Sequence, residues 1–341
     1  MEELKSLKPY NTFGLDVKAK NYYPIYSEHD VYYALSHGVA PYFVLGGGSN
    51  ILLTSDIEES VLHNMIKGIN VIDEDNHQIL VEVGAGEIWH NFVLWSIAHN
   101  LYGLENLSLI PGTVGAAPIQ NIGAYGVEQS NNFHSLKCID LESGESTTYY
   151  KKECNFGYRD SLFKTQLKGK KIITRVRYLL SKTGKTNIEY GDIKNELINN
   201  GIDPSVASIN EVSDAVTKIR RSKLPEPSRL PNSGSFFKNP IVSNQLLNDL
   251  LVKFPNLVYY HIDEFNSKLA AGWLVEQCGF KGKEINGVAC HEKQALVIVK
   301  TSENATGKDI LNYSQAVINE VFEKFNVRLM PEVNIYPNIE N

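Results

Sequence analysis

The chain has little of what marks metal-binding or disulfide-rich proteins. Its 341 residues include only four cysteines, and none of these forms a C-x-x-C pair. The sequence therefore indicates neither a disulfide framework nor a zinc site built on cysteine. The nine histidines form no cluster, and His291-Glu292 lacks the second histidine of a metalloprotease helix. No metal site is predicted.

Excess positive charge and long apolar runs are absent as well. Lysine and arginine number 33 against 39 acidic residues, which gives a net charge of −6. Because nucleic-acid binding needs a basic surface, no nucleic-acid partner is predicted. No apolar run approaches the roughly 18 residues of a membrane-spanning helix, and the first residues lack the apolar core of a signal peptide. We expect a cytoplasmic protein without a membrane partner.

One stretch lacks charge entirely, although 21% of the chain is charged. Residues 111–126 read PGTVGAAPIQNIGAYG, and no charged residue stands between Glu105 and Glu128. Its glycines allow close backbone approach and positive φ angles, so several backbone N–H groups could point at one ligand. A tight, buried connection between two strands is the alternative interpretation. Residues 46–50, GGGSN, form a second glycine-rich segment after a short apolar strand.

Two further segments do not fit the nucleotide-binding motifs that they suggest. Gly84-Ala85-Gly86 lies between a predicted strand and a predicted helix, but Trp89 stands where a dinucleotide-binding fold has its third glycine. Residues 183–186, TGKT, resemble the end of a phosphate-binding loop, but Leu179 replaces its first glycine. We interpret this second segment as the tip of a β-hairpin.

Hydrophobic periodicity and capping residues predict an α+β fold with at least two domains. Ser27 with Asp30, and Ser208 with Glu211, have the spacing of helix capping boxes. Helices are predicted at residues 27–37, 87–100, 208–222, 267–278 and 306–325. Strands are predicted at residues 41–45, 79–83, 136–141, 145–150, 171–180 and 295–300. Residues 223–227, KLPEP, end one helix and indicate a domain boundary.

Short segments in a fixed order along the chain carry a resemblance to one enzyme family. They are residues 11–14, 45–50, 110–126, 158–164, 233–240, 271–274 with 279–282, and 331–333. The chain resembles the UDP-N-acetylenolpyruvoylglucosamine reductases, flavoproteins that make UDP-N-acetylmuramate for bacterial peptidoglycan. Tyr190, in the sequence IEYGD, matches the loop tyrosine of the family's first type and suggests a lid that folds over the substrate.

The resemblance implies a domain organisation within the α+β class. A two-lobed FAD-binding domain of the vanillyl-alcohol-oxidase/PCMH type is expected, followed by a C-terminal α+β substrate-binding domain. Residues 1–70 would form the first lobe, residues 71–219 the second, and residues 220–325 the substrate-binding domain. The tail, residues 326–341, would return to the active site.

The resemblance also implies FAD as cofactor and NADPH as electron source. Backbone N–H groups of the two glycine-rich segments would hold the FAD. These segments contain neither histidine nor cysteine, so the flavin is expected to be bound without a covalent link. The expected cofactor-binding residues are Leu45, Gly46, Gly47, Gly48, Ser49, Asn50, Pro111, Gly112, Thr113, Gly115, Ala116, Ile122, Gly123, Ala124 and Tyr125.

For catalysis, the resemblance implies hydride transfer from flavin N5 to the enolpyruvyl methylene carbon. Arg159 would stabilise the charge that develops next to the carboxylate, and the alternative is a surface ion pair with Asp160. Ser235 would donate the proton, and the alternative is a turn serine that bonds its own backbone. Glu332 would help to hold the developing enol, although a glutamate after proline is most often solvated.

The expected substrate is a UDP-sugar, and a further set of residues would contact its diphosphate or uridine. The set comprises Tyr190, Lys223, Lys238, Asn239 and Gln294. Each lysine could also be an ordinary solvated side chain. A monomer is expected. Two other functions stay open: another FAD-dependent oxidoreductase of the same superfamily, and a flavin-binding module without reductase activity.

Overall fold

A computed structural model describes residues 1–337 of the chain, which form two compact units. The first unit comprises Met1–Ser6, Lys18–Gly48 and Ile57–Ser222. The second comprises Leu7–Val17, Ser49–Asp56 and the chain from Lys223 onward. Two short N-terminal segments therefore fold with the C-terminal part rather than with their neighbours in sequence.

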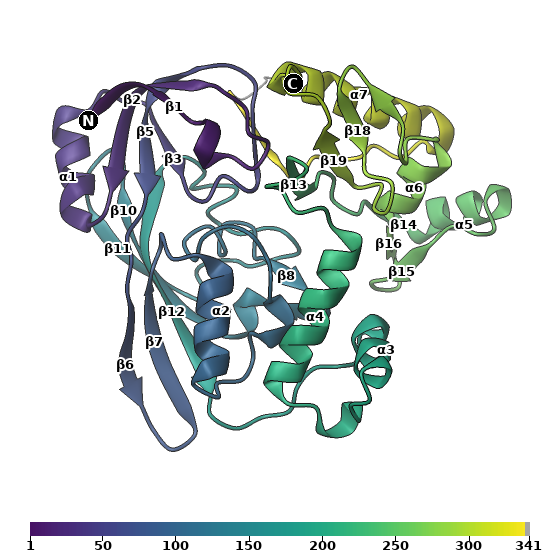
Figure 1. Cartoon of the computed structure of the whole chain (residues 1–341), viewed down its shortest axis with the longest axis horizontal. Helices are drawn as coiled ribbons and strands as arrows, with labels where there is room; N and C mark the ends of the chain where they lie inside the picture. Colours follow the sequence, from purple (N-terminus) through teal and green to yellow (C-terminus); the bar gives the residue numbers. More distant parts are fainter. Residues whose placement is uncertain (338–341) are drawn as a thin grey trace. The chain divides into compact units, whose positions relative to one another are not determined.

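The first unit contains a four-stranded sheet and the helix α1 (Figure 1). In sheet order the strands are β1 (Glu2–Ser6), β2 (Lys18–Ile25), β5 (Ile57–Asn64) and β3 (Tyr42–Leu45). β1 pairs antiparallel with β2, whereas β2, β5 and β3 run parallel. Helix α1 (Glu28–His37) begins with the predicted capping box of Ser27 and Asp30. β3 leads directly into the glycine-rich segment at residues 46–48.

A five-stranded antiparallel sheet forms the other layer of this unit. In sheet order its strands are β11 (Ser146–Tyr150), β10 (Phe133–Asp140), β12 (Lys171–Ser181), β7 (Gln78–Gly84) and β6 (Ile69–Glu74). Val31 and Ala34 of α1 pack in one buried cluster with Ile139 and Ile172 of this sheet. The two sheets therefore share apolar contacts through α1.

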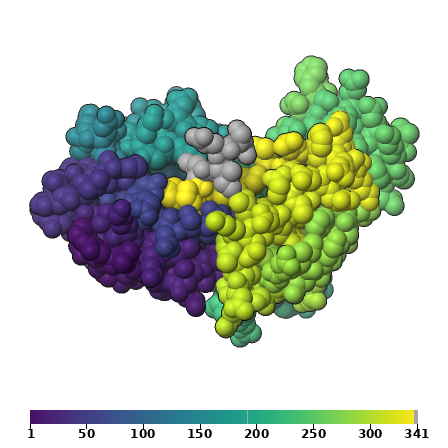
Figure 2. Space-filling view, turned by 90° about the horizontal axis from the view of Figure 1, so that it is seen from above, coloured from purple at the N-terminus to yellow at the C-terminus, as the bar shows by residue number. Residues whose placement is uncertain are grey.

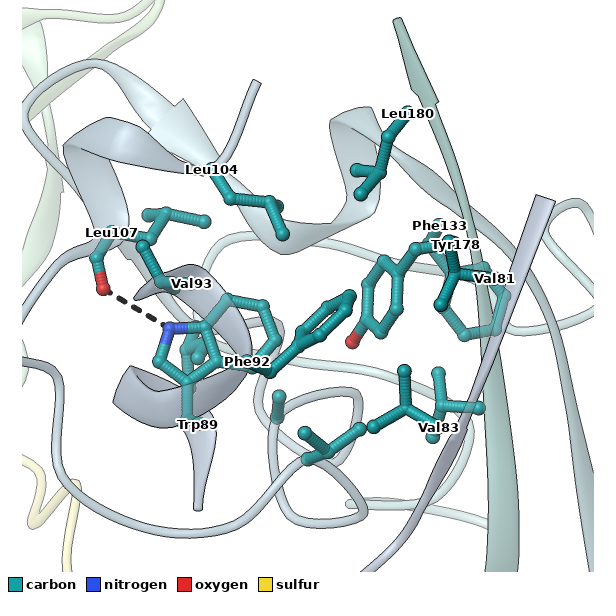
Figure 3. Packing of buried hydrophobic residues seen from close by; sticks show 14 of the residues in the cluster. Val81, Val83, Trp89, Phe92, Val93, Leu104, Leu107, Phe133, Tyr178 and Leu180 are labelled. Carbon is teal, nitrogen blue, oxygen red and sulfur yellow. Dashed lines mark hydrogen bonds between the residues drawn. The ribbon is translucent and has the colours of Figure 1, made fainter. Parts of the chain in front are cut away.

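Helix α2 (Trp89–Ala98) packs on the five-stranded sheet through aromatic residues (Figure 3). Trp89 and Phe92 are fully buried and meet Tyr178 of β12, with ring centroids 5.8 Å and 5.3 Å from it. The indole Nε1 of Trp89 donates a hydrogen bond to the carbonyl oxygen of Leu107 at 3.0 Å. Each buried side chain of this size contributes roughly 1.5–3 kcal/mol. This packing fixes α2 and the loop that follows it.

Two further helices complete the first unit. Helix α4 (Ile209–Lys223) buries Val212, Val216 and Ile219 against Ile193 and Leu197 of α3 (Gly191–Asn199). The predicted capping box of Ser208 and Glu211 begins α4, since each backbone N–H donates to the other side chain. Short elements lie between the larger ones: the 3₁₀ helices η2 (Glu105–Leu107), η3 (Gln129–Asn131) and η4 (Pro204–Val206), and the strands β8 (Gly123–Ala124) and β9 (Val127–Glu128).

The described part of the second unit contains two antiparallel sheets, one parallel strand pair and three α-helices. One sheet has the strand order β13 (Asn232–Ser235), β19 (Val297–Lys300), β18 (Val288–Cys290) and β17 (Glu284–Ile285). A second sheet has the strand order β14 (Ile241–Ser243), β16 (Asn266–Leu269) and β15 (Tyr259–His261). The remaining elements are η1 (Lys8–Tyr10), β4 (Ile51–Leu53), α5 (Asn244–Lys253), α6 (Ala271–Gln277), α7 (Gly307–Phe325) and β20 (Asn334–Tyr336). Figures 1 and 2 show the green segment that carries α5 at the outer edge of this unit.

Two of these elements join distant parts of the chain. β20 pairs in parallel with β4, so that Asn334 lies beside Ile51 and Tyr336 beside Leu53. Helix α7 packs Phe325 against Phe254 and Trp273, with ring centroids 4.7 Å and 5.8 Å apart. The chain after α7 is therefore held to β4 by this strand pair.

Two local predictions were wrong. The helix predicted at residues 267–278 begins only at Ala271, because Ser267 to Leu269 pair as a strand with β14 and β15. The hairpin tip predicted at residues 183–186 is not one, since β12 ends at Ser181 and the chain continues to α3 without another strand. The predicted domain limits at residues 70, 219 and 325 remain predictions.

No helix among residues 1–337 is long and apolar enough to cross a membrane. In the same range no group of three or more His, Cys, Asp or Glu side chains is arranged to hold a metal ion.

Candidate active site

The two glycine-rich segments approach each other closely within the first unit. A Cβ atom on Gly47 would lie 3.1 Å from Cα of Gly112, and a Cβ on Gly46 would lie 3.0 Å from Oγ1 of Thr113. Gly48 and Gly112 have φ angles of +61° and +108°, which favour glycine. Side chains at these positions would fill the space between the segments. The predicted cofactor-binding residues 46–48 and 112–113 are thus brought together, whereas Ser49 and Asn50 belong to the second unit.

The rejected dinucleotide motif has a structural role beside this stretch. Gly115 donates its backbone N–H to the carbonyl of Ala85 at 2.8 Å, and a Cβ on Gly115 would lie 2.5 Å from Cβ of Ala85. A Cβ on Gly86 would lie 2.5 Å from the backbone carbon of Met65. The small residues 84–86 therefore allow their backbone to contact that of Gly115 on one side and that of Met65 on the other.

A buried tyrosine and histidine support the first glycine-rich segment. Tyr22 of β2 and His63 of β5 are 2% and 7% exposed, and Oη of Tyr22 lies 2.6 Å from Nδ1 of His63. Burial lowers the pKa of His63 to about 4, and a hydrogen bond to the backbone of Gly46 opposes that shift. A neutral imidazole has one donor and one acceptor. We infer that Tyr22 donates to Nδ1 while Nε2–H donates to Gly46.

Arg159 lies against the second glycine-rich stretch. Its Nη2 donates to the carbonyl oxygen of Gly123 at 2.6 Å and its Nη1 to that of Asn121 at 3.5 Å. Asn121 in turn donates from Nδ2 to the carbonyl of Gly157 at 3.1 Å. Asn121, Tyr125 and Arg159 all have positive φ angles, of 45°, 50° and 54°. Such backbone strain costs roughly 1–3 kcal/mol per residue and clusters at functional sites.

Tyr125, in the second glycine-rich stretch, interacts with Tyr190 and with Arg220. Its ring meets that of Tyr190 edge to face, with centroids 5.4 Å apart. Arg220 on α4 interacts electrostatically with Tyr125 and with Arg159. The first unit thus brings together Arg159 and the predicted substrate residue Tyr190 beside the second glycine-rich stretch.

Four buried polar side-chain atoms in residues 1–337 have no hydrogen-bond partner, and all lie in or beside the predicted site segments. They are Oγ1 of Thr113, Oδ1 of Asn106, Nε of Arg220 and Oγ of Ser233. The amide Nδ2 of Asn106 donates to the carbonyl oxygen of Tyr125 at 3.1 Å. Buried polar atoms are nearly always paired, so unpaired ones call for an explanation such as a ligand.

Ser235 and Glu332 are brought together in the second unit. The backbone N–H of Glu332 donates to the carbonyl of Phe236 at 2.8 Å, and Pro331 forms a β-bridge with Phe237. Asn50 joins them, because its Nδ2 donates to the carbonyl of Glu332 at 3.4 Å. Three segments that are far apart in sequence therefore meet here, and Arg159 belongs to the other unit.

Asn239 and Gln294 both reach the start of α6. Oδ1 of Asn239 accepts a hydrogen bond from the backbone of Ala271 at 2.9 Å, which leaves its amide group for another partner. A Cβ on Gly272 would lie 3.2 Å from Oε1 of Gln294. Lys238 is held through its backbone N–H, which donates to Met330 at 2.9 Å. Lys223 is exposed at the end of α4.

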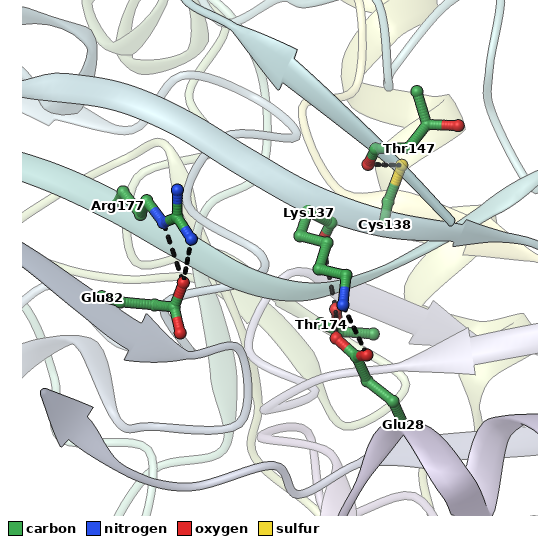
Figure 4. Close-up of polar contacts among 7 residues, drawn as sticks. All are labelled: Glu28, Glu82, Lys137, Cys138, Thr147, Thr174 and Arg177. Atoms are coloured by element: carbon green, nitrogen blue, oxygen red, sulfur yellow. Dashed lines mark hydrogen bonds and ion pairs between the residues drawn. The ribbon is translucent and has the colours of Figure 1, made fainter. Parts of the chain in front are cut away.

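A separate cleft of the first unit was not predicted from the sequence, and Figure 4 shows the polar contacts of some of its residues. It is lined by Ser27, Glu28, Glu82, Lys137, Arg175 and Arg177. Nζ of Lys137 lies 2.7 Å from Oε2 of Glu28, and Nη2 of Arg177 lies 2.7 Å from Oε2 of Glu82. Burial raises the pKa of Glu28, but hydrogen bonds from Lys137 and Thr174 outweigh it and lower that pKa.

Comparison with known proteins identifies the family. Residues 31–149 match the family described as FAD binding domain, and residues 226–336 match the family described as UDP-N-acetylenolpyruvoylglucosamine reductase, C-terminal domain. The UDP-N-acetylenolpyruvoylglucosamine reductase of Flavobacterium johnsoniae is 48% identical over 97% of this chain and 98% of its own length. The chain belongs to the UDP-N-acetylenolpyruvoylglucosamine reductase family. The resemblance predicted from its short segments is confirmed.

Further members of the reductase family agree in length and fold. The reductase of Pseudomonas putida is 45% identical over 98% of both chains. The crystal structure of the reductase of Thermus caldophilus superposes with a TM-score of 0.67 at 22% identity, covering 98% of both chains, and so shows a shared fold. The predicted α+β class, with an FAD-binding domain and a C-terminal reductase domain, is confirmed.

The site residues fit the FAD that the family implies. The cradle between residues 46–48 and 112–113 would be filled by any Cβ, and the buried hydroxyl of Thr113 lacks a partner. Backbone N–H groups and a free hydroxyl are the donors that a pyrophosphate accepts. Sequence reasoning missed Tyr22, His63 and Asn121, although Asn121 lies inside the stretch that it singled out.

Proposed function

We propose that this chain catalyses the NADPH-dependent, FAD-mediated reduction of UDP-N-acetylenolpyruvoylglucosamine to UDP-N-acetylmuramate in peptidoglycan biosynthesis. One observation supports this assignment best. The four unpaired buried polar atoms lie in or beside the segments proposed to bind cofactor and substrate. Buried polar atoms in proteins are nearly always paired, and a bound ligand would supply the missing partners.

FAD, when bound, supplies hydride transfer from NADPH to the enolpyruvyl methylene carbon. The residues proposed to hold it are those of the two glycine-rich segments, Leu45 to Asn50 and Pro111 to Tyr125. Close backbone approach at Gly47 and Gly112 keeps side chains away from the ligand. The Tyr22–His63 pair would hold Gly46 in place from behind the cradle.

Arg159 is proposed to stabilise negative charge on the substrate as it is reduced. Its guanidinium can bind a carboxylate with two hydrogen bonds and keeps its charge at neutral pH. The hydrogen bonds to Gly123 and Asn121 use only part of its five donors and orient the remaining ones. Donors that are fixed before the reaction cost no reorganisation when charge develops.

Ser235 is proposed to give the proton to the adjacent carbon, and Glu332 to help to hold the enol. The hydrogen bond from the backbone N–H of Glu332 to the carbonyl of Phe236 supports this proposal, because Phe236 directly follows Ser235. A serine hydroxyl is a weak acid, but a carbanion-like carbon is a strong base, so fixed geometry is the main requirement.

Tyr190, Lys223, Lys238, Asn239 and Gln294 are proposed to contact the UDP-sugar. Asn239 supports this role because its carbonyl oxygen is bound to Ala271 and its amide is oriented by that bond. Tyr190 is 47% exposed and packs edge-on against Tyr125, as expected of a residue at a site entrance. A cytoplasmic location and a monomeric state remain predictions.

The test separates the two halves of the reaction in a Ser235→Ala variant. Flavin reduction by NADPH should stay near the wild-type rate, because that half needs no proton on carbon. Reoxidation by UDP-N-acetylenolpyruvoylglucosamine should slow by about 10²–10⁴-fold, the usual contribution of general acid catalysis. Stopped-flow absorbance of the flavin follows both halves.

Ser243→Ala is the matched control, because Ser243 caps α5 in the same unit and should affect stability but neither rate. Equal loss in both halves of the Ser235→Ala reaction, or loss in neither, would contradict the role of Ser235. A wild-type protein whose FAD is bleached by NADPH but not restored by the substrate would favour another flavin oxidoreductase. A protein whose FAD is not bleached would favour a binding module.

A further inference from the structure

Tyr22 and His63 lie on one face of the four-stranded sheet of the first unit. Tyr22 of β2 pairs with Val61 of β5, two residues before His63, so the two side chains are diagonal neighbours. His63 in turn lies beside Leu45, the last residue of β3. The imidazole is therefore placed where β3 ends and the first glycine-rich segment begins.

This pair of side chains holds the carbonyl group of Gly46. The ring of His63 donates a hydrogen bond to the carbonyl oxygen of Gly46, and its Nδ1 accepts the hydroxyl of Tyr22 at 2.6 Å. Tyr22 and His63 are only 2% and 7% exposed, so water has little access to either bond. Burial lowers the pKa of His63 to about 4, so at neutral pH the ring is uncharged and keeps this arrangement of donor and acceptor.

The same contact fixes the direction of the next backbone N–H. The peptide bond between Gly46 and Gly47 is trans, so its carbonyl oxygen and its N–H point in opposite directions. Because the carbonyl faces His63, the N–H of Gly47 points away from it. This N–H donates to no backbone carbonyl of residues 1–337, and a Cβ on Gly47 would lie 3.1 Å from Cα of Gly112. A fixed backbone donor is thus held where the two glycine-rich segments meet.

Such an anchor has a purpose because glycine is the residue most easily reoriented. A glycine backbone adopts positive and negative φ angles about equally, so a peptide unit between two glycines can turn over at little cost. A ligand that had to order this unit on binding would lose affinity, whereas a donor oriented in advance would not cause that loss. Apolar side chains at positions 22 and 63 could fill the same space but could not hold the carbonyl.

We propose that Tyr22 and His63 are positioning residues for the cofactor: through the carbonyl of Gly46 they turn the N–H of Gly47 toward the diphosphate of FAD, without contacting the FAD themselves. This inference rests on the proposed function, in which the two glycine-rich segments bind FAD. Diphosphate oxygens are anionic acceptors of the kind that glycine-rich backbone N–H groups bind. The pair therefore raises FAD affinity, whereas a purely structural pair would raise only the stability of the chain.

The experiment separates FAD affinity from stability in the double variant Tyr22→Phe/His63→Leu. Replacing both partners of a buried hydrogen bond by apolar side chains of similar size can leave stability nearly unchanged. The full-length apoprotein is titrated with FAD, followed by flavin fluorescence, and its unfolding in urea is measured separately. FAD affinity should fall about tenfold, as for the loss of one hydrogen bond to a charged group. The urea midpoint of the apoprotein should match that of wild type.

Two single variants give the same test if the double variant does not fold. Tyr22→Phe keeps the imidazole but removes the bond that orients it, so FAD affinity should fall about threefold. His63→Gln keeps an N–H donor and should bind FAD better than the double variant. Tyr23→Phe is the matched control and should stay within twofold of wild type. Tyr23 is the next residue on β2, and its hydroxyl bonds Met1 and the carbonyl of His37 instead.

Two results would overturn the inference. One is a double variant, or a Tyr22→Phe variant, whose FAD affinity equals that of wild type. The other is an affinity that falls only in proportion to the urea midpoint across all variants, which would indicate a structural role. Failure of the proposed function would look different. Wild-type holoprotein would then hold FAD without passing electrons to UDP-N-acetylenolpyruvoylglucosamine, and the FAD affinities would still decide the role of Tyr22 and His63.

Discussion

Two charged regions of the first unit differ in how their cations are partnered. In the cleft beside α1, Lys137 lies 2.7 Å from Glu28 and Arg177 lies 2.7 Å from Glu82 (Figure 4). Beside the second glycine-rich stretch, Arg159 donates to backbone carbonyls, and Arg220 has no carboxylate partner among the described residues. Lys137 and Arg177 of the first region are thus paired with carboxylates, whereas Arg220 of the second is not.

The difference shows which region requires a ligand. A concave surface alone would favour the cleft, but both of its carboxylates and two of its three cations are already held in ion pairs. The glycine-rich region combines Arg220, which has no carboxylate partner among the described residues, with unpaired buried atoms and strained backbone at Asn121, Tyr125 and Arg159. Local electrostatic balance is therefore a better guide to function here than surface shape.

The largest effect should follow from changing a cation of the unbalanced region. Arg159→Lys keeps the charge but loses the two-point contact, so reoxidation by substrate should slow by about 10²–10³-fold, as for loss of one transition-state donor. Rapid-mixing kinetics at the flavin absorbance band measures it. Arg177→Lys in the balanced cleft is the control and should leave both half-reactions within about twofold. Near-normal turnover of Arg159→Lys would remove the functional contrast between the regions.

The next effect concerns His63, whose neutral imidazole bonds the backbone of Gly46 in the first glycine-rich segment. The pKa of His63 is about 4 in the folded chain and 6.5 for an ordinary histidine, so the unfolded chain binds the proton first as pH falls. Stability is therefore lost from about pH 6.5 down to about pH 4. The advantage of wild type over His63→Asn should shrink by about 2 kcal/mol between pH 7 and pH 4.5.

Urea unfolding at several pH values measures this change. His29→Asn, an exposed position on α1, is the control and should keep a constant difference from wild type. A difference that stays constant for His63→Asn as well would contradict the buried, neutral state of the ring.

A smaller effect should come from the cradle itself. Gly47→Ala places a Cβ 3.1 Å from Cα of Gly112, so the two segments proposed to bind FAD would have to move apart, and FAD affinity should fall about tenfold, or about 1.4 kcal/mol. Gly201→Ala is the contrast, because its φ of +74° makes alanine strained while no atom lies within 4 Å. It should lower stability by about 1 kcal/mol and leave FAD affinity unchanged. Titration of each apoprotein with FAD, followed by flavin fluorescence, measures the FAD affinity of the two variants. Equal affinities would contradict the proposal that Gly47 and Gly112 help to bind FAD.

The smallest effect belongs to the balanced region. Glu82→Gln breaks the pair with Arg177, whose side chain is 38% exposed, so stability should fall by less than about 1 kcal/mol. Turnover should not change. Thermal unfolding and steady-state rates check both, and a large loss of turnover would mean that the cleft takes part in the reaction.

Local signals predicted the parts of the fold that local interactions determine. The capping boxes at Ser27 and Ser208 begin helices because the reciprocal hydrogen bonds span only three residues. Strands such as β6, with the sequence INVIDE, were missed because they are mostly exposed and lack apolar alternation. Ser267 was placed in a helix because its strand pairing depends on residues 241–243 and 259–261, which the local sequence does not show.

The candidate site was predicted from motif segments rather than from geometry. The contact between Glu332 and Phe236 joins residues that no local pattern connects, so only the resemblance could place Ser235 and Glu332 in one site. The sequence offers Arg220 only as one of several cations near Lys223 and Lys238, because the absence of a carboxylate around it among the described residues is a property of the folded chain. The same holds for Tyr22 and His63, which lie on strands that the sequence reading did not assign.

The pairing of β4 with β20 has a consequence for the order in which the protein can fold. Thr54 and Tyr336, joined by two hydrogen bonds at the end of this pair, are 282 residues apart. At a synthesis rate of roughly 5–20 residues per second, β4 leaves the ribosome about 14–56 s before its partner exists. During that interval its three apolar residues have no strand to pair with, and a chaperone that covers them would protect the nascent chain from aggregation.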